Sequence, residues 1–214
     1  MIYLLSPLIK DETISLPMIK FELLANEIDF GESNLLMFTS KQAVVSADKI
    51  DSRWKEYDTI AIGGATKKKI EELGGRVLYH PKEFYGEVLA QDIKSFFANK
   101  RILYLRPEEI SFDSKGFLAK EGIDLAEQVL YRTSCCTYPL EAKPKEGATI
   151  IFTSPSTIRC FFRNFTWDES YTAVLIGKAT KAHLPKECRY VVAQRPLIDS
   201  CIKKAKEIYK NSDI

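Results

Sequence analysis

Two strand-to-helix junctions occur twice in this chain, in the same order and at the same distance from each other. The motif FTS at positions 38–40 returns at 152–154, and IGGAT at 62–66 returns as IGKAT at 176–180. Both second copies lie 114 positions after the first (38 to 152 and 62 to 176). Because two different motifs share one offset, the chain is predicted to contain two copies of one α/β unit.

A further similarity runs in the opposite order along the chain. The segment ILYLRP at 102–107, which ends the middle copy, resembles IYLLSP at 2–7, which begins the chain. The two copies are therefore not simply consecutive. The simplest arrangement is nested: the start of the chain completes the domain formed by its end, and the middle copy is inserted between them.

The nested arrangement sets the expected domain bounds. Residues 1–19 and 136–214 form one domain that contains both termini, and 20–135 form the inserted domain. The connecting segments, about 16–22 and 128–135, are expected to pair as a two-stranded linker. Alternating apolar runs and amphipathic stretches predict an α/β fold, with open, mostly parallel sheets and helices on both faces. Each half is expected to be flavodoxin-like.

Local patterns predict several elements within this frame. Leu35–Phe38 is expected to be a buried strand, followed by a helix with Ser40 as its N-cap. Residues 7–14 are expected to form a loop or a single turn, and 211–214 to fray. A helix is expected over Glu87–Asn99, with these side chains facing inward: Val88, Ile93, Phe96 and Phe97.

Charge and hydropathy exclude two classes of partner. Lys+Arg number 31 and Asp+Glu 29, so the formal net charge is only +2, which argues against a dedicated nucleic-acid-binding protein. No apolar run approaches the roughly 20 residues of a membrane span, and the N-terminus lacks the basic region of a signal peptide. We therefore expect a cytoplasmic protein without a membrane partner.

The cysteine and histidine content gives no indication of a structural disulfide or of a metal-binding site. Five Cys at irregular positions do not suggest a disulfide framework, and we expect buried structural thiols, with reactive thiols as the alternative. The chain has only two His, and no metal-ligand spacing emerges. We expect no metal and no cofactor.

The repeated junctions are the candidate binding site. In open parallel sheets, ligands bind at the carboxyl ends of the strands. Each junction combines hydroxyls with free backbone N–H groups at a helix N-terminus, which favours anions, and the two Gly allow close approach of a ligand to the backbone. The alternative is that the hydroxyls only cap their helices. The candidate residues are Thr39, Ser40, Gly63, Thr66, Thr153, Ser154, Ser156, Gly177, Lys178, Ala179 and Thr180.

Common catalytic motifs are absent, which leaves one ionisable group of interest. GGATKKK at 63–69 lacks the end of a P-loop, and neither G-x-G-x-x-G nor G-x-S-x-G occurs. Tyr131 lies in the expected linker, where its hydroxyl could face a ligand. A phenol can donate a proton to a leaving hydroxyl without first being charged. The alternative is an aromatic side chain that only packs on the linker.

Taken in order, the motifs FTS, IGGAT and IGKAT, ILYLRPEE, VLYRT and RPLIDSCIKKA resemble uroporphyrinogen-III synthase over nearly the whole chain. The resemblance implies a cofactor-free lyase of tetrapyrrole biosynthesis. It would close linear hydroxymethylbilane to uroporphyrinogen III in a cleft between two domains, with loss of water and inversion of ring D. The several carboxylates of this substrate would account for the anion-binding junctions.

The resemblance also implies roles for individual residues. Tyr131 would help the hydroxyl to leave, and Ser154 and Thr180 would contact substrate in the domain that holds both termini. Ser40 and Thr66 would be their partners in the inserted domain. Arg106 stands where the family has an Arg-Gly type of turn, and it would contact a substrate carboxylate.

One segment departs from the family pattern. About ten residues separate the first strand from the linker, where the family usually has a helix and a further strand. We therefore expect the domain with both termini to lack a helix and to expose part of its sheet.

Two other functions are compatible with the sequence. A non-catalytic two-domain binding protein for an anionic small molecule would use the same helix N-termini, and a family member that has lost turnover would keep the fold. We expect a monomer, because no exposed apolar stripe demands a partner.

Overall fold

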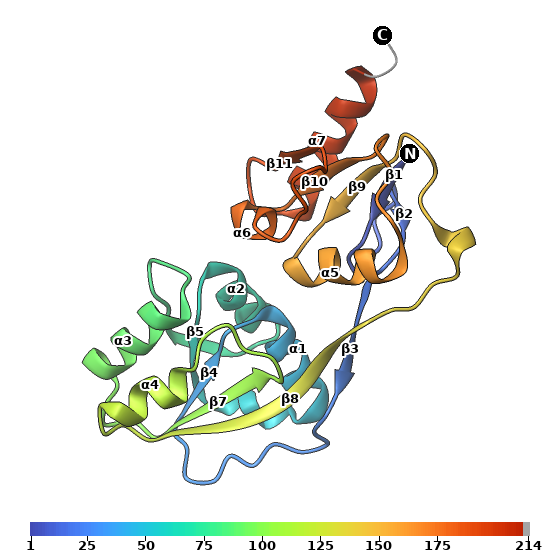
Figure 1. Cartoon of the computed structure of the whole chain (residues 1–214). Helices are drawn as coiled ribbons and strands as arrows, with labels where there is room; N and C mark the ends of the chain where they lie inside the picture. The colour runs from blue at the N-terminus through green and yellow to red at the C-terminus, as the bar shows by residue number, and fades with distance from the viewer. Residues whose placement is uncertain (212–214) are drawn as a thin grey trace. The chain divides into compact units, whose positions relative to one another are not determined.

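The computed structural model describes residues 1–211 and divides into two compact units (Figure 1). Unit 1 comprises Met1–Lys20 and the chain from Ser134 onward, and unit 2 comprises Phe21–Thr133. The expectation that 211–214 fray falls mostly on 212–214, which lie outside the described residues. None of the helices in residues 1–211 is long and apolar enough to cross a bilayer.

Unit 2 is built on a six-stranded sheet in the order β3-β8-β7-β4-β5-β6. The pairs from β8 to β6 are all parallel. The elements are β3 (Ile19–Leu23), β4 (Leu35–Phe38), α1 (Lys41–Ile50), the 3-10 helix η1 (Ser52–Glu56), β5 (Asp58–Ala61), α2 (Gly64–Glu72), β6 (Arg76–Tyr79), α3 (Gly86–Phe96), β7 (Ile102–Pro107), α4 (Ser114–Lys120) and β8 (Leu125–Cys135).

Unit 1 is built on a five-stranded sheet in the order β11-β10-β9-β1-β2, in which every pair is parallel. Its elements are β1 (Ile2–Leu4), β2 (Ile14–Ser15), the 3-10 helix η2 (Leu140–Ala142), β9 (Thr149–Phe152), α5 (Pro155–Asn164), β10 (Thr172–Leu175), α6 (Lys178–Lys181), β11 (Tyr190–Val192) and α7 (Ile198–Asn211).

The two sheets have the same spatial order. Counted along the chain, the strands of unit 1 lie in the order 2-1-3-4-5, which is that of flavodoxin. The parallel strands of unit 2 take this order too when β7 and β8 are counted before β4. The expected fold class, two similar flavodoxin-like halves with one inserted in the other, is therefore confirmed, and the halves differ by a circular permutation.

The two-stranded linker is also confirmed. Strands β3 and β8 are neighbours in the sheet, and both run from one unit into the other (Figure 1). The Leu24 N–H donates to the Leu130 carbonyl, and the Cys136 N–H donates to the Met18 carbonyl, each at 2.9 Å. Because the residue numbers rise on one strand as they fall on the other, the two strands are antiparallel.

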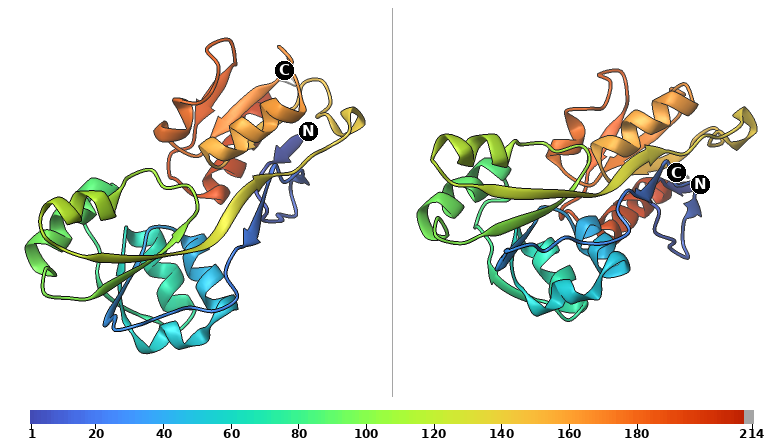
Figure 2. Two further views of the ribbon diagram at one scale, coloured as in Figure 1. Left: turned by 60° about the horizontal axis from the view of Figure 1, so that its bottom comes forward. Right: turned by 90° about the horizontal axis from the view of Figure 1, so that it is seen from below.

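The central strands are buried on both faces, because helices cover both sides of each sheet (Figure 2). In β4 the side chains of Leu36 and Phe38 pack with α1 and α2, while Leu35 and Met37 pack with α3 and α4. In β9, Phe152 packs with α5 and the preceding Ile151 with α7. This burial explains why Leu35–Phe38 and 150–152 are continuous apolar runs without polar alternation.

Helix ends follow the expected signals. Ser40 is the N-cap of α1, where its side chain accepts a hydrogen bond from the Ala43 N–H at 3.0 Å. Helix α2 is followed by Gly74, whose φ of 90° lies in the left-handed region that favours glycine.

The prediction that Phe96 faces inward is wrong. Its side chain is 65% exposed, whereas α3 buries Leu89, Ala90 and Ile93. The Phe96 ring lies 6.2 Å from that of Tyr79 on β6. Because β6 is the edge strand, the sheet offers no further surface to cover the ring.

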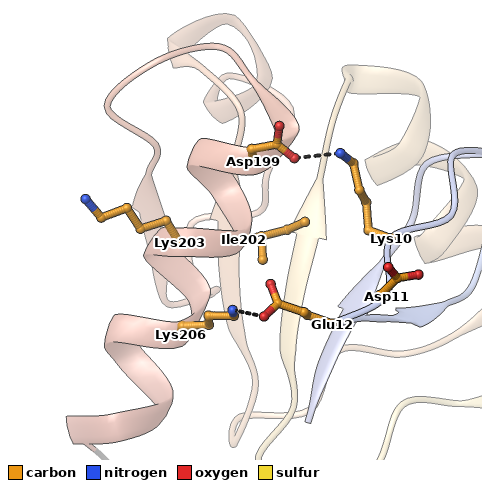
Figure 3. Close-up of a pocket in the computed structure, with 7 residues that line it drawn as sticks. All are labelled: Lys10, Asp11, Glu12, Asp199, Ile202, Lys203 and Lys206. Carbon is orange, nitrogen blue, oxygen red and sulfur yellow. Dashed lines mark hydrogen bonds and ion pairs between the residues drawn. The ribbon is translucent and has the colours of Figure 1, made fainter.

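Residues 5–13 of unit 1 form no helix, as expected, although unit 2 has α4 at the corresponding place between β7 and β8. This loop is held to α7 by two ion pairs, Lys10 with Asp199 at 2.7 Å and Glu12 with Lys206 (Figure 3). Between loop and helix lies a groove of about 420 Å³. Part of the sheet edge is open as well, since Ile14 is 42% exposed.

The prediction that the cysteines form no disulfide is wrong for one pair. Cys135, at the end of β8, is bonded to Cys160 in α5, while Cys136, Cys188 and Cys201 are free. The sequence spacing gave no sign of this bond, because it depends on how α5 packs beside the end of β8.

Reduction of the Cys135–Cys160 bond is expected to destabilise unit 1 by about 3 kcal/mol, because the bond closes a loop of 25 residues. Trp167 reports on unit 1 and Trp54 on unit 2 when the other is replaced by Phe. Dithiothreitol should lower the denaturation midpoint seen by Trp167 and leave that of Trp54 unchanged. Thiol titration of the unfolded protein should find three free thiols without reductant and five with it. Five thiols in both samples would contradict the bond.

Candidate functional site

Thr39 and Ser40, which directly follow β4, lie beside two phenols of unit 2, Tyr104 in β7 and Tyr131 in β8. The three strands are adjacent and parallel, so side chains at their ends lie at one edge of the sheet. The Thr39 Oγ1 lies 2.7 Å from the Tyr104 hydroxyl, and the Ser40 Oγ lies 2.9 Å from the Tyr131 hydroxyl. Two consecutive residues of the FTS motif therefore each contact a phenol.

The Tyr131 ring packs against a neighbouring ring, and its hydroxyl makes a polar contact. The residue is therefore compatible both with a packing role on the linker and with a role as a proton donor. The side chain is only 4% exposed, and its ring lies edge-on to Phe21 at 5.7 Å. Burial raises the pKa of the phenol, and the hydrogen bond with Ser40 lowers it in part. The phenol is therefore protonated at neutral pH and can act as a proton donor.

Tyr104 is a site residue that the sequence analysis missed. It is 2% exposed, and burial raises the pKa of its phenol, against the lowering effects of Thr39 and Arg106. The available signal was its position two residues before Arg106, which places both side chains on one face of β7.

Arg106 lies beside a second missed residue, Glu127. The Arg106 Nη1 donates to the carbonyls of Pro107 and Glu108, both at 3.0 Å, and Nε lies 3.2 Å from Glu127 Oε2. The two side chains are only 18% and 15% exposed. Within residues 1–211, the buried Arg106 Nε and Glu127 Oε1 have no hydrogen-bond partner. The pair is thus close enough for charge attraction but is not aligned for a hydrogen bond.

The register of β7 and β8 explains why Glu127 escaped the sequence analysis. Glu127 pairs with Tyr104 across the two strands, so it belongs to the same cluster. In the sequence it stands far from both Tyr104 and Arg106, and only the pairing of the strands brings them together.

Capping explains Ser40 and Ser154 but not the two candidate threonines. Ser154 is the N-cap of α5 and forms a capping box with Thr157. The N-caps of α2 and α6 are Gly63 and Gly177, neither of which can offer a side chain. Thr66 and Thr180 each lie three residues further on, and they are buried, at 4% and 2% exposure. Their hydroxyls therefore do not cap these helices.

The two N-cap glycines differ in their surroundings. A Cβ on Gly63 would lie 2.3 Å from the Phe84 ring, so this Gly is explained by packing. Around the corresponding position on Gly177 no atom lies within 4 Å. Only the second glycine therefore leaves room for a ligand beside the backbone.

The remaining candidates lie at the ends of two neighbouring strands of unit 1. Phe152 pairs with Leu175, so the residues that follow β9 and β10 share one edge of the sheet. The residues after β9 are half-buried, and Lys178 and Ala179 after β10 are exposed. The residues of this set are Thr153, Ser154, Ser156, Gly177, Lys178, Ala179 and Thr180.

The chemistry of the two sets differs. The set in unit 1 offers hydroxyls, backbone N–H groups and one Lys, which suits carboxylates. The set in unit 2 adds two buried phenols and an Arg, which suits an anion together with a proton donor. Across residues 1–211, no group of three or more His, Cys, Asp or Glu side chains could hold a metal ion.

Solved structures resemble the chain over nearly its full length. Uroporphyrinogen-III synthetase from Helicobacter pylori 26695 gives a TM-score of 0.80 at 25% identity, covering 97% of this chain and 98% of that one. A mutant uroporphyrinogen III synthase from the extremely thermophilic bacterium Thermus thermophilus gives 0.57 at 11% identity over 98% of each chain, which shows the fold alone.

Sequence comparison points to the same family. A porphyrin biosynthesis protein HemD from Ruminiclostridium josui is 30% identical over 196 residues. The alignment covers 83% of this chain and 38% of that protein, so the chain spans less than half of this relative's length. Residues 6–203 match the family described as uroporphyrinogen-III synthase HemD. The chain therefore belongs to the uroporphyrinogen-III synthase family.

Proposed function

We propose that this protein converts linear hydroxymethylbilane to uroporphyrinogen III, with loss of water and inversion of ring D. Family membership supports the substrate and the product. The observation that carries the proposal is the Ser40–Tyr131 contact of 2.9 Å, which holds a protonated phenol at the carboxyl end of a parallel sheet. Such a phenol is the proton donor that a leaving hydroxyl needs.

The protein has a limited chemical task in this reaction. The C–O bond of the terminal hydroxymethyl group breaks, and the electrons of the attached pyrrole expel the oxygen. The proton of Tyr131 joins that oxygen, so that water leaves. A pyrrole carbon of the substrate then attacks through a spiro intermediate that inverts ring D. The ring carbon that forms the closing bond loses its proton, which balances the proton given by Tyr131. The nucleophile belongs to the substrate, so the protein supplies a proton, holds the chain and excludes direct closure.

The two sets of donors would hold the carboxylates of the substrate. In unit 1, Thr180 and the open backbone at Gly177 are the proposed contacts, with Ser154 and Lys178 beside them. In unit 2, Arg106 is the proposed cationic contact. A carboxylate there would also offer an acceptor to Arg106 Nε, which is ion-paired with Glu127 but has no hydrogen-bond partner among the described residues. We propose that one substrate engages the donors of both units.

The first test is product analysis with freshly prepared hydroxymethylbilane and purified protein. Spontaneous closure gives the type I isomer, so a predominance of type III is the expected result. A folded, monodisperse protein that yields only type I while binding the bilane would favour the alternative, a binding protein for an anionic small molecule. No cofactor is added, because the proposed reaction needs none.

Tyr131→Phe is expected to lower kcat for the type III product on the order of 100-fold, because it removes the proton donor. The matched control is Tyr138→Phe, which also removes one phenolic hydrogen bond, to the Pro17 carbonyl, but lies in unit 1 away from the candidate residues. The control should keep wild-type turnover. Equal activity of the two variants would remove Tyr131 from the mechanism.

Thr180→Val is expected to lower kcat/KM about tenfold or more, since a hydrogen bond to a charged group is worth about 1.5–3 kcal/mol. Valine keeps the volume of this buried side chain, so the thermal midpoint should change little. Thr180→Ser keeps the hydroxyl and should retain most of the activity. Wild-type kinetics in Thr180→Val would show that the hydroxyl does not contact substrate.

A further inference from the structure

We propose that Ser40 is a positioning residue that acts through Tyr131: its hydroxyl donates to the Tyr131 oxygen and leaves the phenolic proton for the ligand. This inference rests on the proposed function, in which Tyr131 is the proton donor. It gives Ser40 a role different from the direct substrate contact expected from the sequence.

The contacts of Ser40 are compatible with a hydrogen bond that runs from Ser40 to Tyr131. Its Oγ accepts from the Ala43 N–H at 3.0 Å and lies 2.9 Å from the Tyr131 hydroxyl. If Ser40 donates to Tyr131, the chain runs from Ala43 N–H through Ser40 O–H to Tyr131 O–H and onward. All three donors then point the same way, away from the positive end of α1, and each bond polarises the next.

The proton transfer itself requires this direction. When Tyr131 gives its proton to the leaving hydroxyl, negative charge develops on the phenolic oxygen. An oxygen that carries this charge can only accept, so Ser40 has to donate to it. The bond is therefore stronger in the transition state than in the ground state, which is the condition for catalysis.

The neighbouring phenol provides an internal comparison. Tyr104 contacts Thr39 at 2.7 Å, but the N-cap of α1 is Ser40 and not Thr39. The backbone N–H groups at the start of α1 are therefore connected, through Ser40, to Tyr131 and not to Tyr104. Of the other titratable groups, Tyr104 interacts electrostatically with Tyr131, and Arg106 and Glu127 act on Tyr104. All three stay unchanged in the variants below.

Two substitutions separate the two functions of Ser40. Asp and Thr both cap helices, so Ser40→Asp and Ser40→Thr should keep α1 intact, with unchanged thermal midpoints. Thr keeps a hydroxyl that can donate. An Asp carboxylate can only accept, so Tyr131 must donate to it, which points its proton away from the ligand.

A first readout needs no substrate. In protein labelled with ¹³C at the tyrosine ring, the signal of Tyr131 is identified by its loss in Tyr131→Phe. The Ser40 hydrogen bond lowers the pKa of Tyr131. A carboxylate beside the phenol would raise this pKa by its charge alone, so the titration uses Ser40→Gly, which removes the hydroxyl, adds no charge and still caps the helix. Its titration midpoint should lie about one pH unit or more above that of the wild type. Ser40→Thr should titrate like the wild type. Equal midpoints in Ser40→Gly and wild type would overturn the proposal.

The second readout is a double-mutant cycle on turnover. Ser40→Asp should lower kcat on the order of 100-fold, like Tyr131→Phe, whereas Ser40→Thr should stay within about threefold of wild type. In the Tyr131→Phe background, Ser40→Asp should have no further effect, because residues that act as a unit are not additive. A full additional loss in that background would mean that Ser40 contacts substrate directly and would overturn the inference.

The two proposals can fail separately. If the wild-type protein forms no type III isomer, the proposed function fails, while the tyrosine titration still reports whether Ser40 donates to Tyr131. If type III forms and the titration midpoint does not respond to Ser40→Gly, the inference fails and the proposed function stands.

Discussion

Burial of the central strands on both faces is the constraint on which the structure depends. Every residue of β4 and β9 is buried, and the only polar one among them is Thr149, at the start of β9. At the carboxyl ends, hydroxyls appear where the strands leave the core, at Thr39 and Thr153. Because the neighbouring strands are parallel, the residues that follow them lie at the same edge. Core packing and the position of the candidate site therefore have one cause.

Features that depend on local pattern or on the internal repeat could be predicted from the sequence. The bounds of β4, the N-cap at Ser40 and the permuted relation of the halves belong to this group. Features that depend on packing between distant segments could not. The Cys135–Cys160 bond needs the position of α5, and the exposure of Phe96 follows from the edge position of β6.

The residues of the candidate site also fall into two groups, those that one continuous segment predicts and those that depend on packing between distant segments. The FTS and glycine junctions were visible because each lies on one continuous segment. Tyr104 and Glu127 were not, because their proximity arises from the register between β7 and β8. The structure also sorts the junction residues by physical role: Ser40 and Ser154 cap helices, Gly63 accommodates Phe84, and the buried Thr66 and Thr180 have no capping role. A repeated motif thus combines residues kept for local stability with residues available for binding.

The permuted connectivity has a consequence for synthesis on the ribosome. In unit 2 the pairing partners lie within one continuous segment, as Leu35 with Ile102, so its sheet can form while translation continues. In unit 1 the apolar strand β1 is made first, yet Ile2 pairs with Thr149. At typical translation rates this partner emerges on the order of ten seconds later. Until the inserted unit has been completed, the nascent chain must therefore carry β1 with only β2 available as a partner, which leaves one edge of β1 open to aggregation.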